Sequence, residues 1–280
     1  MQKQTKKITI TQACQFLGHS RQAWYQHNTR LSKQRAHDVR IIDFVKTIRV
    51  RQARIGTRKL HYLLNKQSDD GLHVGRVRLF SLLKERQLLV PVRRAYHKTT
   101  DSHHRFRRYP NLLKTGPEQV MVKRPEQVWV ADITYLSIRN GMVYLSLITD
   151  ACSRKIMGHH VHSNLRTDNV VQALKQALKQ RKTTQPLIHH SDSGIQYCSA
   201  SYQSIHERHV LICSMTDGYN CYQNALAERV NGVLKTEFLL SRPADLEQAR
   251  TMVRESIEIY NRERPHQALT RCGASGVLQT

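Results

Sequence analysis

The sequence has few acidic residues, few aromatic residues and no long apolar run. Its 21 Asp and Glu residues face 45 Lys and Arg residues, so the formal net charge is +24, and Phe, Trp and Tyr make up only 6% of the chain. Such an excess of positive charge indicates a polyanionic partner, either nucleic acid or an anionic membrane surface. Because aromatic residues are sparse, we expect a core built mainly from Leu, Val, Ile and Ala.

No apolar segment is long enough to span a bilayer, and none of signal-peptide length follows the basic N-terminus. The six Cys residues are scattered, without a C-x-x-C pair or a Cys/His cluster at zinc spacing, which argues against a zinc finger. The sequence therefore predicts reduced thiols in a cytosolic protein that has no membrane partner.

The positive charge is concentrated in the first half of the chain. Residues 1–125 hold 28 Lys and Arg against 7 Asp and Glu, whereas residues 126–280 hold 17 against 14. This asymmetry predicts a front module that binds phosphates and a back module with a different task. The alternative at this level is a ribosomal or other structural RNA-binding protein.

Residues 1–30 have the pattern of a helix-turn-helix. Ala13 and Leu17 lie one helical turn apart, Gly18 is placed to end the first helix, and Ser20 is placed to cap the second. A charged helical stretch follows, and it opens a basic helical region that we expect to cover residues 31–90.

Two further helices are predicted between residues 55 and 89. Their expected inner faces are Leu60, Leu63 and Leu64 on the first helix, and Val77, Phe80 and Leu83 on the second. The second helix also carries basic residues that we expect to contact DNA, namely Arg76, Arg78, Lys84 and Arg86. The alternative is an ordinary helical hairpin with a solvated basic face.

Residues 91–125 are rich in Pro, Gly, Ser, Thr, His and Arg and predict an extended basic linker. Residues 126–280 then change to an α/β pattern. Strands are expected at 127–138, 141–151, 154–162, 186–192 and 210–215, and helices at 167–181, 200–209, 222–238 and 245–263. Three hairpin-linked strands followed by helix, strand, helix, strand and helices is the order of a ribonuclease-H-like α/β core with a five-stranded mixed sheet.

The helix expected at 222–238 has an unusual polar stripe. Asn224, Glu228, Asn231 and Lys235 follow one another at steps of four, three and four, so they share one face. Taken alone, this stripe is best explained as a solvated surface, because most helices in soluble proteins have a polar face. The other interpretation is one wall of an active site.

Three carboxylates favour the active-site interpretation. Asp132 lies in the middle of a strand that is apolar on both faces, and Asp192 ends a later strand just before Ser193 and Gly194. Singly, Asp132 could pair with a buried Arg, and Asp192 could be ordinary turn chemistry. Together with Glu228, in this order along the chain, they are expected to converge at one edge of the sheet.

Three neighbouring carboxylates repel one another unless cations lie between them. Divalent cations that prefer oxygen ligands fit such a site, so we expect two Mg²⁺ ions, for which Mn²⁺ can substitute. Two ions held in this way promote both the attack and the departure of oxygen atoms in phosphodiester chemistry.

The chain resembles a known family. It is similar over nearly its whole length to the catalytic subunit, the second reading-frame product, of bacterial insertion-sequence transposases of the IS-three group, in the DDE retroviral-integrase superfamily. The resemblance rests on "VWVADITYL", "HHSDSGIQYCS", "YQNALAERVNGVLKTEF" and "YNRERPHQAL", and on similar motifs in the basic half. Thirty-five residues separate Asp192 from Glu228, and Lys235 follows Glu228 by seven positions, a spacing that is specific to this group.

The resemblance implies roles for the residues of the stripe. Asp132, Asp192 and Glu228 would be the catalytic triad and the metal ligands, and Lys235 would contact DNA near the transposon end. Asn224 and Asn231 would orient DNA or the groups around the metal ligands, with plain solvation as the alternative. Gln223 stands where the family usually has Asp, and Arg229 where it usually has Ser, and neither departure removes a catalytic group.

We therefore expect a transposase that cuts and joins double-stranded DNA at the ends of its own insertion sequence and at its target. The family further implies a bridged or circular product of the first joining step, a homo-oligomer on DNA, and a bacterial, nucleoid-associated location. It also implies an upstream-frame helix-turn-helix and coiled-coil protein as partner or fusion, although no heptad segment is visible. The rivals are a catalytically inactive DNA-binding regulator and a ribonuclease-H-like nuclease.

Overall fold

The computed structural model describes residues 9–67, 72–91, 109–117, 119–217 and 224–266, and the chain divides into two units. The helical unit comprises residues 1–50 and 56–90, and the sheet unit comprises residues 51–55 and 91–280. Within the described ranges, no helix has the length and apolar character needed to cross a membrane.

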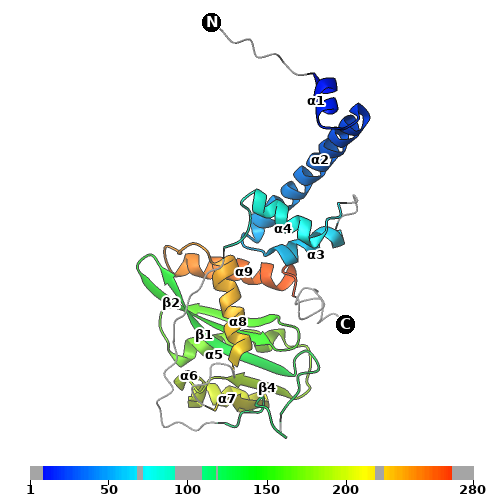
Figure 1. Ribbon diagram of the computed structural model, residues 1–280. Helices are drawn as coiled ribbons and strands as arrows, with labels where there is room; N and C mark the ends of the chain where they lie inside the picture. The colour runs from blue at the N-terminus through cyan, green and yellow to red at the C-terminus, as the bar shows by residue number, and fades with distance from the viewer. Residues whose placement is uncertain (1–8, 68–71, 92–108, 118, 218–223, 267–280) are drawn as a thin grey trace. The chain divides into compact units, whose positions relative to one another are not determined.

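The helical unit begins with two capped helices. Thr9 and Gln12 form a capping box at the start of α1, and the Ser20 hydroxyl accepts a hydrogen bond of 3.1 Å from the Ala23 amide at the start of α2. The helices are α1 Ile10–Phe16, α2 Arg21–Arg51, α3 Thr57–Gln67 and α4 Arg76–Glu85 (Figure 1). The expected boundary at residue 30 falls inside α2, which continues without a break for 31 residues.

Helices α3 and α4 bury Leu-rich faces. Leu60, Leu63 and Leu64 of α3 are buried, as predicted. The prediction for α4 was wrong at Val77 and Phe80, whose side chains are 75% and 39% exposed. The buried residues of α4 are Leu79, Leu82 and Leu83. Both sets fit helical spacing, and the helix turns its leucines inward, so that only Leu83 of the predicted set is buried.

The sheet unit contains one five-stranded mixed sheet in the order β3-β2-β1-β4-β5. Strands β1, β2 and β3 form the predicted antiparallel meander, whereas β4 runs parallel to β1 and β5 runs parallel to β4. The strands are β1 Val128–Ile138, β2 Gly141–Asp150, β3 Ile156–His162, β4 Leu187–Ser191 and β5 Leu211–Met215. The associated helices are α5 Thr167–Gln180, α6 Ile195–Cys198, α7 Ala200–Arg208, α8 Ala225–Val233, the π-helix η2 Leu234–Phe238 and α9 Leu246–Arg262.

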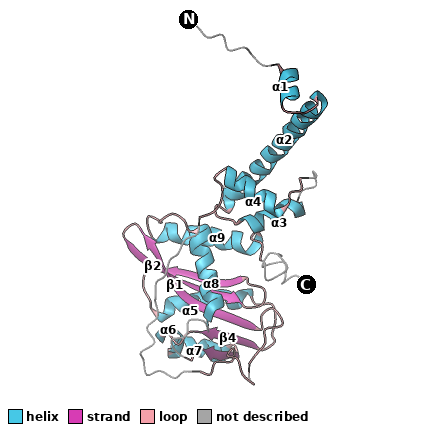
Figure 2. Ribbon diagram, in the orientation of Figure 1, coloured by secondary structure: helices cyan, strands magenta, loops and turns pink. Residues whose placement is uncertain are grey.

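Helices cover both faces of the sheet (Figures 1 and 2). Helices α5, α6 and α7 pack on the face that carries Trp129 and Ala131, and α8, η2 and α9 pack on the face that carries Leu145 and Leu147. Helix α5 reaches the sheet most closely at Gly158, where an added Cβ atom would lie 2.1 Å from the Ala173 carbonyl oxygen. Burial on both faces explains why the strands are rich in apolar residues.

Part of the expected linker belongs to the sheet unit. Leu112, Leu113 and Val120 pack against Val128 and other buried residues of β1 and β4. The Leu112 amide also donates a hydrogen bond of 3.0 Å to the Ser214 hydroxyl on β5. Residues 92–108 and residue 118 of the expected linker lie outside the described residues.

Candidate active site

Asp132 occupies the middle of β1, on the face that α8 covers. Its Oδ1 atom accepts a hydrogen bond of 2.9 Å from the Ile133 amide, and its Oδ2 atom accepts one of 2.7 Å from the Asn231 side chain. The carboxylate is therefore held by the strand on one side and by α8 on the other, in a partly buried position.

Asp192 follows the last residue of β4 and lies beside Asp132. The parallel pairing of β1 and β4 ends where Val130 meets His190, and Asp132 and Asp192 each follow that pair by two residues. The negative charge of Asp192 raises the pKa of Asp132, so the two carboxylates lie within electrostatic range. The Gly194 amide donates 3.0 Å to Asp192 Oδ1, and a Cβ atom on Gly194 would lie only 2.9 Å from that oxygen.

Glu228 comes from α8, which packs against β1 and β2 (Figure 1). Helix α8 is anchored through Ala227 and Val230, which are buried, while the Glu228 side chain is exposed. Glu228 lies three residues before Asn231, the residue that binds Asp132, and therefore on the same face of the helix.

The neighbouring carboxylates perturb Asp132 and Glu228. The pKa of Asp132 is raised to about 7, chiefly by burial and in smaller part by the negative charges of Asp192 and Glu228. Burial and the charge of Asp192 also raise the pKa of Glu228. In the described part of the chain, no three Asp, Glu, His or Cys side chains already stand in a metal-binding geometry. The carboxylates are thus close enough to repel one another but are not gathered as ligands.

Asn224 and Asn231 face the sheet. They are 6% and 5% exposed, and the Asn224 amide donates a hydrogen bond of 3.0 Å to the Ala131 carbonyl oxygen. The side-chain oxygens of both residues are buried without a hydrogen-bond partner among the described residues. These contacts argue against plain solvation and against direct DNA contact, and they favour the role of orienting Asp132 and its surroundings.

Lys235 lies on η2, where the helix changes from α to π. The change is marked by a hydrogen bond of 2.8 Å from the Leu239 amide to the Leu234 carbonyl oxygen, five residues back. Burial lowers the pKa of Lys235, and the negative charge of Asp132 opposes that shift. The amine is therefore within electrostatic range of Asp132.

Arg264 fixes η2 in place. Its Nε and Nη2 atoms donate to the two carboxylate oxygens of Glu237 at 2.9 and 3.0 Å, and its guanidinium lies 5.4 Å from the centre of the Tyr260 ring. Sequence analysis did not assign a role to Arg264, although it belongs to the "YNRERPHQAL" motif.

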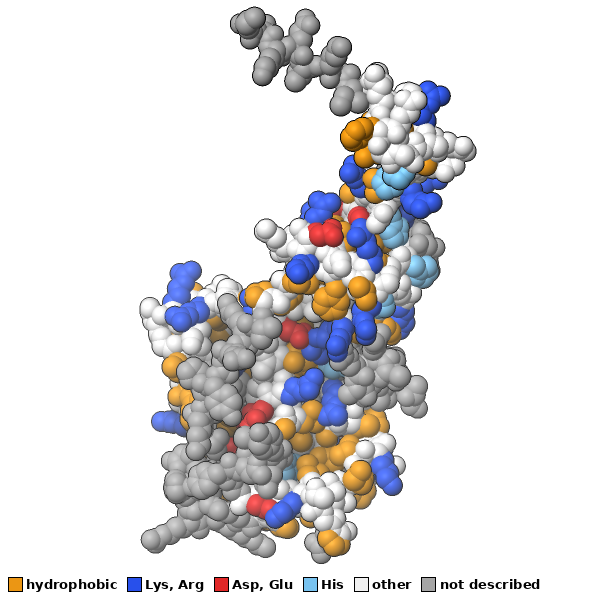
Figure 3. Space-filling view, in the orientation of Figure 1, with side chains coloured by type: hydrophobic (Ala, Val, Ile, Leu, Met, Phe, Trp, Pro, Cys, Tyr) orange, Lys and Arg blue, Asp and Glu red, His pale blue; other side chains and the backbone are white. Residues whose placement is uncertain are grey.

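The basic residues predicted on α4 fall into two groups. Arg76, Lys84 and Arg86 are exposed, so they are available to a phosphate backbone. Arg78 instead binds Asp38 of α2 at 2.5 Å, and the Asp38 side chain is largely buried. Arg78 thus has a structural contact within the helical unit. On the face of this unit seen in Figure 3, Lys and Arg side chains outnumber acidic ones.

Tyr197 was missed by sequence analysis. It lies on the short helix α6 just after Asp192, it is 2% exposed, and its hydroxyl has no hydrogen-bond partner among the described residues. Burial, the neighbouring Tyr202 and the charges of Asp192 and Asp132 raise its pKa well above the usual value. The only signal in the sequence was its distance of five residues from Asp192.

The sheet order and the position of the carboxylates define a ribonuclease-H-like core of the integrase type. Two family models described as integrase core domain match residues 122–221 and 211–273. Among solved structures, the HTLV-2 integrase catalytic core domain in complex with magnesium is similar with a TM-score of 0.44 and 16% identity, covering 55% of this chain and 97% of that chain.

Relatives from insertion sequences match almost the whole chain. The insertion element IS600 uncharacterized 31 kDa protein of Shigella sonnei is 37% identical over 91% of this chain and 93% of its own length. The transposase InsF for insertion sequence IS3A of Escherichia coli K12 is 30% identical over 95% of this chain and 92% of its own length. The chain belongs to the family of insertion-sequence DDE transposases with an integrase core, which act in DNA transposition.

Proposed function

We propose that this protein cleaves and joins phosphodiester bonds at the ends of its own insertion sequence, with Asp132, Asp192 and Glu228 as the catalytic carboxylates. The observation that supports the proposal is the proximity of three carboxylates from β1, the end of β4 and α8: the charge of Asp192 raises the pKa of both Asp132 and Glu228, and the charge of Glu228 raises that of Asp132. Carboxylates that raise a neighbour's pKa in this way call for a cationic partner.

The donor set fits divalent cations. All three side chains offer oxygen ligands, and the buried side-chain oxygens of Asn224 and Asn231 can accept hydrogen bonds from water in the site. Mg²⁺ suits such ligands, and Mn²⁺ can take its place. When bound, two such ions would favour both the attacking and the leaving oxygen of an in-line displacement.

The chain's own residues hold the reacting groups. Asn231 fixes one oxygen of Asp132, and the Gly194 amide fixes one oxygen of Asp192. Lys235 would contact a phosphate of the DNA end. In cleavage, a water oxygen bonds to phosphorus and the 3′ oxygen of the element end leaves and takes a proton. In joining, that 3′-hydroxyl oxygen bonds to the phosphorus of a second phosphodiester, whose own 3′ oxygen leaves.

The helical unit would supply most of the DNA affinity through the exposed Arg76 and Lys84 of α4 and Arg86, which follows it. Simultaneous work on two DNA ends requires two active sites, so we also propose a homo-oligomer on DNA. The upstream-frame partner remains an expectation.

The decisive experiment incubates the full chain with Mg²⁺ and a labelled duplex that carries an end of the insertion sequence. Joined products support the proposed transposase. Cleavage without joining would instead make the protein a nuclease, and binding without either reaction would make it a regulator. Omission of Mg²⁺ is the matched control, and it should suppress both reactions without releasing the DNA.

A further inference from the structure

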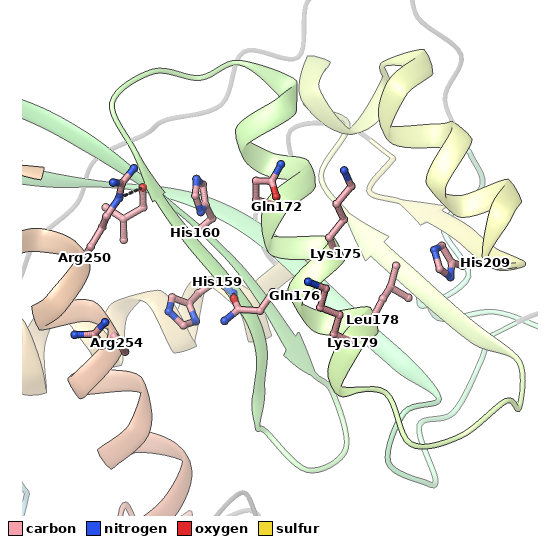
Figure 4. Close-up of a pocket in the computed structure, with 11 residues that line it drawn as sticks. His159, His160, Gln172, Lys175, Gln176, Leu178, Lys179, His209, Arg250 and Arg254 are labelled. Carbon is pink, nitrogen blue, oxygen red and sulfur yellow. Dashed lines mark hydrogen bonds between the residues drawn. The ribbon is translucent and has the colours of Figure 1, made fainter. Parts of the chain in front are cut away.

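A basic pocket lies at the outer edge of the sheet unit, away from the carboxylates. It has a volume of about 650 Å³ and lies along β3, the last strand of the sheet, between α5 and α9. Figure 4 shows Lys175 and Lys179 of α5 on one side, Arg250 and Arg254 of α9 on the other, and His159 of β3 between them.

Cations line the pocket with little compensation from acidic side chains. No Asp or Glu is among its lining residues, and Lys175, Lys179 and Arg254 form no ion pair within the described residues. Arg250 does bind Glu247 at 2.5 Å, but the Glu247 side chain is 77% exposed, and surface pairs of this kind contribute little. The side chains on α5 and α9 therefore present unneutralised positive charge to one opening.

The pKa values of the β3 histidines are lowered in this environment. The pKa of His159 is lowered to about 4, chiefly by burial and in smaller part by the neighbouring His160 and Arg254. Burial and the charge of Arg250 also lower the pKa of His160. An anion in the pocket would offset this repulsion, so the site is better matched to a negatively charged ligand than to water alone.

The free edge of β3 is closed to another strand. The His159 amide donates 2.7 Å to the Gln176 side-chain oxygen, and Arg250 Nε donates 3.2 Å to the Val161 carbonyl oxygen. Side chains thus occupy backbone groups that an added strand would need. A second copy of this face would also place cations against cations, which disfavours self-association here.

The pocket and the candidate active site lie on the same row of paired residues across the sheet. Asp132 pairs with Leu147 of β2, and Leu147 pairs with His159 of β3, so one row of residues joins the two sites. Two strand spacings amount to about 10 Å. DNA held at the carboxylates is therefore within reach of the pocket.

We propose that this pocket is a second DNA-binding site, which takes the phosphate backbone of a duplex between α5 and α9. Several separated cations on two helices suit a string of phosphates better than a single small anion. The identity of the polyanion rests on the proposed transposase function, whereas the charge and shape of the pocket do not. The duplex is either the element end or the target.

The test compares two double variants of the full chain. The pocket variant combines Lys175→Glu and Lys179→Glu, and the control variant combines Lys182→Glu and Arg208→Glu. Both pairs change the charge equally on exposed side chains of the sheet unit, and only the first pair lines the pocket. Binding to an element-end duplex and to an unrelated duplex is measured over a range of salt without Mg²⁺. We expect the log–log salt slope to weaken by about 1.8 in the pocket variant alone, since two phosphate contacts are lost.

If the pocket variant binds both duplexes more weakly, the ligand of the pocket is the backbone of any DNA, including the target. If it binds only the element-end duplex more weakly, the ligand is that end. An unchanged slope, an equal loss in the control, or a change confined to self-association in sedimentation would overturn the proposal. A photo-crosslinker at the exposed Gln172 gives a second measurement in an otherwise unaltered pocket, and it should join to DNA. A chain that binds through the pocket but cleaves nothing would refute only the proposed function. If the wild-type chain joins DNA but the pocket variant binds DNA with an unchanged salt slope, only this inference is refuted.

Discussion

The centre of the sheet gathers negatively charged side chains, whereas its outer edge gathers positively charged ones. At β1 and β4, burial and neighbouring carboxylates raise the pKa of Asp132, whereas at β3, burial and the neighbouring His160 and Arg254 lower the pKa of His159. The chain's own side chains neutralise each group only in part, through Lys235 at the centre and Glu247 at the edge. Each site is therefore incomplete without a partner: cations at the centre and an anion at the edge.

The comparison also separates chemistry from binding. The central site positions its carboxylates with hydrogen bonds from Asn231 and the Gly194 amide, whereas the edge pocket relies on exposed, long side chains such as Lys175 and Lys179. Fixed groups suit a reaction that requires defined geometry, and adaptable cations suit a polyanion of variable sequence.

The largest effect is expected from Glu228→Gln at the centre. This substitution keeps the size of the side chain but removes one ligating charge, so it should abolish both cleavage and joining and leave DNA binding nearly intact. Gel analysis of labelled element ends with Mg²⁺ measures the reactions, and anisotropy measures binding. Asp132→Asn and Asp192→Asn should behave alike. Joining at the wild-type rate would remove Glu228 from the ligand set.

Lys235→Ala should lower activity on element ends by one to two orders of magnitude. Loss of one charge-assisted phosphate contact costs about 1.5–3 kcal/mol, and the metal site itself should remain. Lys235→Arg should restore much of the rate, because either cation meets a phosphate. Calorimetric Mg²⁺ affinity should be unchanged or slightly higher in Lys235→Ala. Full activity at physiological salt would show that Lys235 makes no such contact.

Without divalent cations, Asp132→Asn should remove the loss of stability that wild type shows as the pH rises from about 4 to above 7. The folded-state pKa of Asp132 is raised from 3.8 to about 7, so its stabilising protonated form is present below pH 3.8 and is lost as the pH rises through 7. The variant should therefore melt about 2–4 °C above wild type at pH 8 and equally at pH 3.5, for a gain of about 1 kcal/mol. Identical profiles would show that the carboxylate is not strained.

His159→Gln should show the opposite slope with a smaller amplitude. The pKa of His159 is lowered from 6.5 to about 4, so its contribution is present above pH 6.5 and is lost as the pH falls through 4. Near pH 4, the variant should melt about 1–2 °C above wild type and match it at pH 8. Melting in acetate and phosphate-free neutral buffers measures this. A difference that persists at pH 8 would indicate a packing effect instead.

The strands of the sheet were predicted well because their apolar pattern is strong. Strands β1, β2 and β3 lie within two residues of their expected bounds and pair as expected. The spacing from Asp192 to Glu228 and Lys235 also pointed to one site, and the structure brings these side chains within electrostatic range of one another or of Asp132.

Other features depend on contacts that spacing does not encode. Asp150 is a strand carboxylate like Asp132, but it is fully buried, and it accepts hydrogen bonds from the amides of Glu126, Cys152 and Ser153 at the turn that follows. Sequence pattern does not distinguish a carboxylate that receives three backbone donors from one that faces other carboxylates.

Ambiguous helical phase and scattered apolar residues explain the remaining differences. On α4, two sets of positions fit helical spacing, and the contact of Arg78 with Asp38 accompanies the set that turns Val77 outward. In the expected linker, Leu112 and Leu113 have no periodic neighbours, so their packing against β1 and β4 depends on the folded sheet.

Gly158 has a consequence for genetics. Because α5 touches β3 there at backbone distance, even alanine would push the helix outward and disturb the sheet on which the carboxylates depend. A random screen for inactive proteins would therefore recover substitutions at Gly158 together with those of the carboxylates. Sorting them by residual DNA binding and by protein abundance would separate lost chemistry from lost folding, and Gly158 belongs to the second class.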